Sequence, residues 1–121
     1  HLTDLKIKPD YYDLSLTGDL GVYGKEILIE NLKQGGIDIS RNYNDCGLIL
    51  YDRERQPVYA GASGPSSSAL VFSAYIMKEM ERGRYRKVLL VPTGAIFSPT
   101  RVFQGDSIPS IAHAIGLEVD E

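Results

Sequence analysis

The chain has 121 residues, of which 43% are hydrophobic and 24% charged, and its formal net charge is -3. These values are typical of one soluble globular domain that buries roughly two thirds of its unfolded surface. The 13 basic residues are outnumbered by 16 acidic residues and form no run, which argues against a general nucleic-acid binder.

Two further classes are excluded by the absence of particular features. No apolar stretch approaches the roughly 20 residues that a membrane span needs. Cys46 is the single cysteine, so no internal disulfide can form, and a reducing compartment is favoured. The chain begins at His1 and carries no signal peptide. We therefore expect residues 1–121 to be one domain and a fragment of a longer protein.

The first third of the chain predicts a strand, a glycine-bearing turn and a helix. After a short amphipathic lead-in at His1–Lys8, apolar and polar residues alternate in Tyr11–Thr17, as in a strand. Val22–Gln34 has apolar residues at helical spacing, and Gly35-Gly36 ends it. This order of elements indicates α/β architecture.

The middle of the chain predicts a second strand between polar segments. Ile37–Asn44 is expected to be a polar connector, and Cys46–Tyr51 is an apolar run expected to form a buried strand. Asp52–Gln56 is predicted as a charged turn. Pro57–Ala60 is then expected to be a hairpin partner or an edge strand.

A long helix is predicted at Ser66–Arg82, and its first three turns carry no charge on any face. Such a helix is expected to be buried on all sides, with a sheet beneath it and a further layer above it. The apolar run Lys87–Pro92 is predicted as a strand in the middle of a parallel sheet. Ile96–Glu121 is expected to be mostly loop, with a closing strand at Ile111–Val119.

Three glycines follow the first strand, where a phosphate-binding turn would lie. Gly18, Gly21 and Gly24 do not have the spacing of a dinucleotide site, and Asp19 would repel an anion. We therefore predict that these glycines allow a turn to pack tightly.

Two motifs resemble catalytic or metal sites only superficially. Gly61–Pro65 is similar to a nucleophile elbow but lacks its closing glycine, and His113 is the only internal histidine for a triad. Cys46 is predicted to be a buried structural thiol, because no basic residue adjoins it, and His113 is predicted to be a core histidine. Cys46 and His113 are too few for a zinc site, so we predict no metal and no cofactor.

Several segments together resemble the stage V sporulation protein AD family of spore-forming bacteria, in its C-terminal half. The resemblance covers nearly the whole chain from about Tyr11. It rests on TGDLG at 17–21, NYNDCGLILYDRE at 42–54, AGASGPSSSA at 60–69, VPTGAIFSPT at 91–100 and QGDSIPSIAHAI at 104–115.

The resemblance implies a thiolase-like fold, as in thiolases and ketoacyl synthases. Such a protein has two similar halves, each with a five-stranded mixed sheet, stacked in alternating layers. This chain would be the C-terminal half of that double fold, and Ser66–Arg82 would be its buried central helix. An N-terminal half outside residues 1–121 would supply the other layer.

The resemblance also implies which residues would carry thioester chemistry. In ketoacyl synthases the C-terminal half offers a histidine after its first strand and often an asparagine before the central helix. Those positions fall near Gly18-Asp19 and Gly64 here. In thiolases a second cysteine lies in a glycine-rich turn, which corresponds to Thr93-Gly94. None of the three groups is present, so the chain is predicted not to be an enzyme.

Members of the family are understood to bind dipicolinic acid, which the spore stores with calcium. The resemblance therefore implies a role in moving this compound into the forespore, and in its release at germination. Its partners would be membrane proteins of the same operon, on the inner membrane of the spore inside the cell. The predicted ligand-binding residues are those of three turns in the former catalytic cleft: Thr17, Gly18, Asp19, Ser63, Gly64, Thr93 and Gly94.

Two other functions stay open at this point. One is an acyltransferase of the ketoacyl-synthase type, and the other is an interaction module that docks on spore membrane channel proteins. In either case we expect the apolar surface of the long helix to seek cover, most simply in a homodimer. That predicted surface consists of Leu70, Val71, Phe72, Tyr75 and Ile76.

Overall fold

The computed structural model of the chain describes residues 1–61, 64–92, 94–95 and 98–120. Within these residues the fold is α/β, with an open, mixed four-stranded sheet in the order β2-β1-β3-β4. β1 pairs in parallel with β2 and with β3, whereas β4 is antiparallel to β3. The strands are β1 (Leu14–Thr17), β2 (Tyr43–Asp45), β3 (Lys87–Val91) and β4 (Ile115–Glu118). The predicted mixed sheet is confirmed, but the count of five strands is wrong for the described residues.

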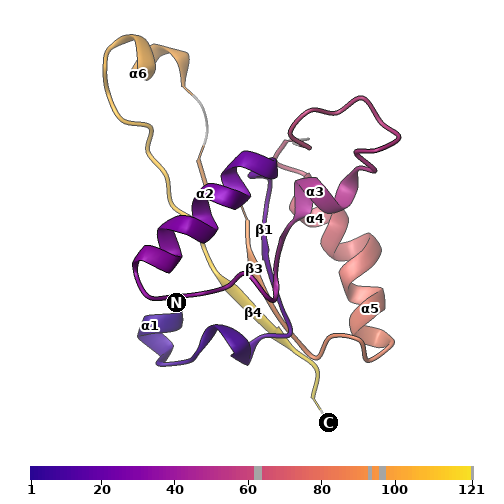
Figure 1. Cartoon of the computed structure of the whole chain (residues 1–121). Coiled ribbons are helices and arrows are strands. Elements are labelled where there is room, and N and C mark those ends of the chain that lie inside the picture. The colour runs from indigo at the N-terminus through magenta and orange to yellow at the C-terminus, as the bar shows by residue number, and fades with distance from the viewer. Residues whose placement is uncertain (62–63, 93, 96–97, 121) are drawn as a thin grey trace.

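Helices lie on both faces of this sheet. α2 lies on one side, and the long helix formed by α4, η2 and α5 lies on the other (Figure 1). Both are crossover connections between parallel strands, which need a dozen or more residues. The helical elements are α1 (Leu2–Leu5), η1 (Pro9–Tyr11), α2 (Gly21–Gln34), α3 (Cys46–Leu50), α4 (Ser67–Val71), η2 (Phe72–Ile76), α5 (Met77–Glu81) and α6 (Pro99–Phe103).

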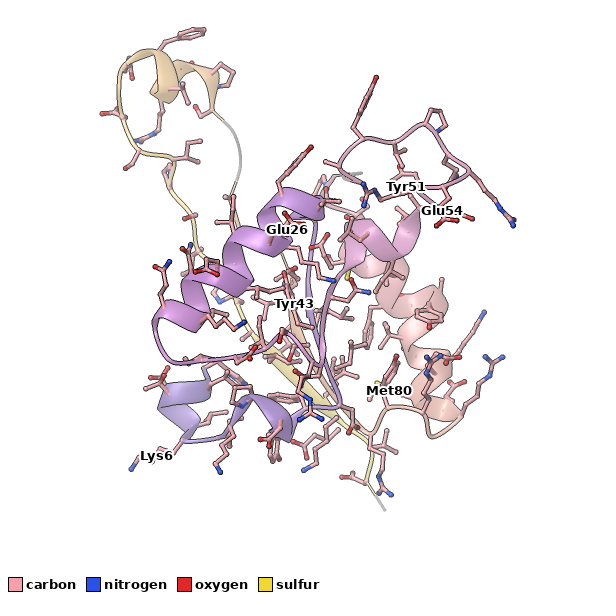
Figure 2. The ribbon with its side chains drawn as sticks, in the orientation of Figure 1. Lys6, Glu26, Tyr43, Tyr51, Glu54 and Met80 are labelled. Carbon is pink, nitrogen blue, oxygen red and sulfur yellow. The ribbon has the colours of Figure 1, made fainter. Side chains whose placement is uncertain are left out.

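The main core lies between the sheet and the long helix. It consists of Leu16, Cys46, Val71, Ile76, Val88 and Leu90, and Met80 packs against it from the side of α5 (Figure 2). Leu16, Val88 and Leu90 occupy one face because strand side chains alternate between the two faces of a sheet. Tyr43 is buried on the α2 side, in the centre of the molecule (Figure 2).

The long helix is confirmed, but its predicted burial on all sides is wrong in this chain. Ser67, Val71 and Ile76 face the sheet and are buried. The opposite flank consists of Ala69, Leu70, Ser73, Ala74 and Met77, all exposed, with Leu70 at 54% and Met77 at 44%. The physical reason is that one sheet covers only one side of a helix. Of the predicted apolar surface, Leu70 and Tyr75 are exposed, whereas Val71 and Ile76 belong to the core.

The middle turn of this helix, η2, is a π-helix. Because the backbone stays right-handed and helical through Val71, Phe72, Ile76 and Met77, the three segments form one continuous rod. A π-turn widens the helix locally and is uncommon. The prediction from spacing alone did not include it.

The predicted strand at Cys46–Tyr51 is wrong. Residues 46–50 form α3, and the strand is the preceding Tyr43–Asp45, whose first two residues belong to the predicted connector Ile37–Asn44. A short apolar run fits a buried strand and a buried helix equally well. Asp45 decides between them, because its side chain accepts a hydrogen bond from the Gly47 amide and caps α3.

Most other predicted elements are confirmed, the strands with shorter bounds. The first strand begins only at Leu14, the first long helix is confirmed as α2, and the closing strand is β4. The apolar strand of residues 87–92 is β3, although it has one antiparallel neighbour. The charged turn at 52–56 is confirmed, whereas Pro57–Ala60 forms bends and no strand. His113 is exposed, so its assignment to the core is wrong.

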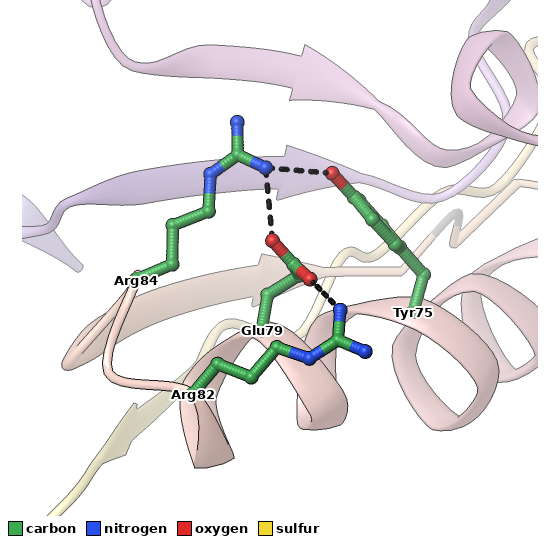
Figure 3. A network of polar contacts seen from close by, with 4 residues as sticks. All are labelled: Tyr75, Glu79, Arg82 and Arg84. Carbon is green, nitrogen blue, oxygen red and sulfur yellow. Dashed lines mark hydrogen bonds and ion pairs between the residues drawn. The ribbon is translucent and has the colours of Figure 1, made fainter.

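An ionic network fixes the end of the long helix against the loop that follows. The Glu79 carboxylate is buried and accepts hydrogen bonds from Arg82 Nη1 and Arg84 Nη1, each at 2.8 Å. Figure 3 shows Glu79 between the two guanidinium groups, with Tyr75 pointing toward Arg84. The hydrogen bond from Arg84, followed by that from Arg82, lowers the pKa of Glu79.

The lowered pKa makes this network a pH-dependent source of stability. Because the folded state binds the Glu79 proton more weakly than the unfolded chain, the stabilisation is complete above the ordinary glutamate pKa of about 4.3. It is lost as pH falls through the folded pKa. The difference in free energy of unfolding between wild type and Glu79→Gln should therefore be largest near pH 7 and shrink below about pH 4. Urea denaturation across this range measures it, with the exposed Glu81→Gln as control. A difference that does not change with pH would contradict the assignment.

Candidate functional site

The sheet topology marks one place where a ligand is expected. From β1 the chain passes through α2 to β2 on one side, and from β2 it crosses to β3 on the other side of β1. In open α/β sheets a ligand usually binds in the crevice at the carboxyl ends of two neighbouring strands, here β1 and β3, whose crossover connections lie on opposite faces of the sheet. A cavity of about 290 Å³ lies there, and its lining includes Thr17, Gly18, Val91, Gly94 and Ala112. We call it the switch-point crevice.

The fully buried carboxylate of Asp45 organises the turn beside this crevice. Its Oδ2 accepts hydrogen bonds from Thr17 Oγ1 at 2.6 Å and from the Leu20 amide at 2.9 Å. Its Oδ1 accepts hydrogen bonds from the amides of Gly21 and Gly47, each at 3.1 Å. The negative charge also lies at the N-terminus of α2, where the helix dipole favours it. Asp45 thus ties together β1, α2, β2 and α3.

Tyr43 extends this network into the core. Its hydroxyl lies 2.7 Å from Thr17 Oγ1. Since the Thr17 proton goes to Asp45, Tyr43 donates to Thr17. Burial is the main cause that raises the pKa of Tyr43 to about 12, so the phenol stays neutral.

A second carboxylate joins the first turn to the start of the long helix. Asp19 Oδ2 accepts a hydrogen bond from the Gly64 amide at 2.5 Å. Ser67 Oγ donates to the carbonyl of Gly64 at 2.6 Å and lies 3.3 Å from that of Gly18. The structure therefore brings two of the three predicted ligand-binding turns into direct contact.

Gly94 belongs to the third predicted turn and borders the crevice together with Thr17 and Gly18. The Ile111 amide donates to the Gly94 carbonyl at 2.9 Å, and a side chain at Gly94 would collide with the Ile111 carbonyl. A catalytic cysteine therefore has no room at this position. Ser63 and Thr93, the two other predicted site residues, lie outside the described residues.

The hydrogen-bond donors of the first turn are largely committed. The amides of Leu20, Gly21 and Gly64 already donate to Asp45 and Asp19.

Sequence reasoning missed Asp45, although one signal pointed to it: a lone acidic residue directly before an apolar segment is a typical helix cap. It also predicted that the glycines serve tight packing. Gly21 does so, because its φ is 67° and a side chain there would lie 2.6 Å from the Ala60 carbonyl oxygen.

The predicted structural role of Cys46 agrees with its position. The thiol is fully buried in the core, and burial is the main cause that raises its pKa to about 12.

Among the described residues no group of three histidine, cysteine or acidic side chains has the geometry of a metal site. In the same part of the chain, no helix has the length and apolarity that crossing a membrane requires.

Comparison with known proteins identifies the family. The model of the stage V sporulation protein AD family matches residues 1–118. The chain belongs to the stage V sporulation protein AD family. It is also 42% identical over 118 residues to the stage V sporulation protein AD of Bacillus subtilis (strain 168). That match covers 98% of this chain and 35% of the relative, so the chain spans about a third of the relative's length. The resemblance seen in the sequence is confirmed, and it begins at residue 1 instead of near Tyr11.

Asp45 offers a direct test of how this member of the stage V sporulation protein AD family is held together. Asp45→Asn replaces acceptor lone pairs with N–H groups that face amide donors in a dry interior. We expect the free energy of unfolding to fall by about 2–4 kcal/mol in urea denaturation. The exposed Asp10→Asn should change it by less than about 0.5 kcal/mol. Equal stability of the two variants would refute the role of Asp45.

The Cys46 thiol should be chemically silent in the folded protein. At pH 8 a thiol with a pKa of about 12 is ionised to roughly one part in ten thousand, and only the thiolate is nucleophilic. We expect iodoacetamide to leave native protein unlabelled for hours and to label it stoichiometrically in concentrated urea, as measured by mass spectrometry. Stoichiometric labelling of native protein within minutes would show that the thiol is accessible.

Proposed function

We propose that the chain is part of a non-catalytic sporulation protein that binds dipicolinic acid. In this proposal the protein supports uptake of dipicolinic acid into the forespore and its release in germination. Membership of the stage V sporulation protein AD family supports the sporulation role. Two cavities among the described residues support ligand binding in general. The switch-point crevice has a volume of about 290 Å³, just under the roughly 300–1,000 Å³ of small-molecule pockets, and a depression on the opposite face of the sheet has about 650 Å³.

The observation that carries the non-catalytic part is the pairing of Asp19 with the Gly64 amide. In a thiolase-like arrangement these two positions would hold the histidine and the asparagine that act on a thioester. A carboxylate there would oppose a developing oxyanion, and it also engages the neighbouring backbone donor. The crowding of Gly94 by Ile111 argues in the same direction at the third position. An acyltransferase is therefore the weaker alternative.

The exposed flank of the long helix favours a second role in protein interaction. Leu70 and Met77 are large apolar side chains on a flank that otherwise consists of small residues. We propose that either the N-terminal half of the full-length protein or a second copy in a homodimer covers this flank. The whole assembly would associate peripherally with the inner spore membrane through membrane proteins of the same operon.

Two measurements on the full-length protein test the proposed function. In equilibrium dialysis we expect saturable binding of dipicolinic acid, with and without calcium. On incubation with acyl-CoA we expect no covalent adduct in intact-mass spectrometry. A stoichiometric acyl-enzyme would overturn the non-catalytic proposal, and absence of saturable binding would leave only the interaction role.

A further inference from the structure

A larger depression lies on the other face of the sheet from the switch-point crevice. It has a volume of about 650 Å³ and runs between β1, α3 and the long helix. Leu14, Ile49 and Val71 contribute to its apolar surface, and the aromatic side chains are Tyr75 and Tyr85. Its polar lining residues are Arg84 and Asn44, and no acidic residue of the described chain lines it. We call it the Arg84 groove.

Arg84 is held in place by one edge of its guanidinium group. Nη1 donates to Glu79 Oε2 at 2.8 Å and to the Tyr75 hydroxyl at 3.4 Å, as Figure 3 shows. The guanidinium carbon lies 5.4 Å from the centre of the Tyr85 ring. Every hydrogen bond from the Arg84 side chain to the described residues uses Nη1. The edge formed by Nε and Nη2 therefore has no acceptor in that part of the chain, and this edge matches a carboxylate in a bidentate pair.

Asn44 offers a second set of donors in the same groove. Its Oδ1 accepts hydrogen bonds from Lys25 Nζ and from the Asp45 amide, each at 2.9 Å. These two contacts define which end of the amide is the oxygen. The Nδ2 group donates to no acceptor within the described residues, and is therefore available to a ligand.

The groove carries positive charge where the crevice carries negative charge. Glu79 is close to Arg84, but its charge is shared by two arginines. The crevice, in contrast, adjoins the carboxylates of Asp19 and Asp45, which already use the neighbouring amides. A ligand with carboxylate groups is therefore attracted to the groove and repelled from the crevice.

We propose that the Arg84 groove binds an aromatic carboxylate. The carboxylate pairs with the Nε and Nη2 edge of Arg84, and the ring packs on the apolar surface beside Tyr75 and Tyr85. A second carboxylate on the same ring would be a suitable acceptor for Asn44 Nδ2. This inference rests on the proposed function in one respect, because it supplies the cation that dipicolinic acid needs and that the crevice lacks.

The exposed flank of the long helix is compatible with this site. Leu70 and Ala74 belong both to the flank and to the lining of the groove. A protein layer packed on the flank would therefore cover the groove from above and exclude water from the ion pair. Exclusion of water strengthens an ion pair with a bound carboxylate.

The test compares two arginines that share the Glu79 carboxylate, of which only one lines the groove. Arg82 and Arg84 each donate to Glu79 at 2.8 Å, but only Arg84 lines the groove. Binding of dipicolinate, benzoate and uncharged pyridine to the full-length protein is measured by isothermal titration calorimetry at low and moderate salt. Arg84→Gln should weaken binding of both carboxylates roughly ten- to a hundredfold. Arg82→Gln should change it less than about twofold, and pyridine should bind poorly throughout.

Two further variants keep the outcome decisive. Arg84→Lys retains a charge beside Glu79 and loses the bidentate edge, so it should fold normally and still bind carboxylates several-fold more weakly. Ala112→Leu narrows the crevice and a second cavity that Ala112 lines, but not the groove, so carboxylate binding in the groove should be unchanged. Circular dichroism and thermal unfolding establish that each variant is folded.

The results separate this inference from the proposed function. Normal binding to folded Arg84→Lys and Arg84→Gln, with binding lost in Ala112→Leu, would overturn the groove and leave the proposed function in the crevice. Arg84-dependent binding of benzoate without binding of dipicolinate would support the groove and overturn the proposed function. Absence of binding by every aromatic carboxylate would overturn both.

Discussion

The fold depends on one buried carboxylate. Asp45 is fully buried, and its two oxygens accept hydrogen bonds from Thr17, Leu20, Gly21 and Gly47. These four donors come from the end of β1, the start of α2 and the start of α3. A buried charge is tolerated only when its lone pairs are satisfied, so these segments must meet at one point. The segments meet at the carboxyl end of β1, which has β2 on one side and β3 on the other. The switch-point crevice lies beside this point.

The same constraint separates the chemistry of the two faces. On the side of α2 the carboxylates of Asp45 and Asp19 use the backbone donors that a phosphate or a dicarboxylate would otherwise bind. On the side of the long helix the Glu79 carboxylate has the opposite effect, because it holds Arg84 by one edge and leaves the other edge open. The committed backbone donors near Asp45 and the open edge of Arg84 thus lie in separate parts of the chain.

The exposed flank of the long helix follows from the single sheet that packs against it. The chain covers 35% of the length of its Bacillus subtilis relative. A single four-stranded sheet covers one side of the helix, and Val71 and Ile76 are buried there. The opposite flank of the helix is uncharged and exposes the large apolar side chains of Leu70 and Met77. An exposed apolar surface of this kind is typical of a protein interface. The charge-free pattern in the sequence therefore predicts cover on all sides of the helix, and the described residues supply it on one side.

The amino-acid sequence was enough to predict the α/β class, the positions of α2, the long helix, β3 and β4, and the family. Each of these depends on local periodicity, on glycine and proline stops, or on motif identity. The folded structure was needed to show that residues 43–45 are a strand and 46–50 a helix, since pairing with β1 and the Asp45 cap outweigh a short apolar run. It alone decided that Arg84, Asn44 and Tyr75, distant in sequence, line one groove. Contacts between distant segments form only when the crossover helices bring β1, β2 and β3 side by side, and no local pattern encodes them.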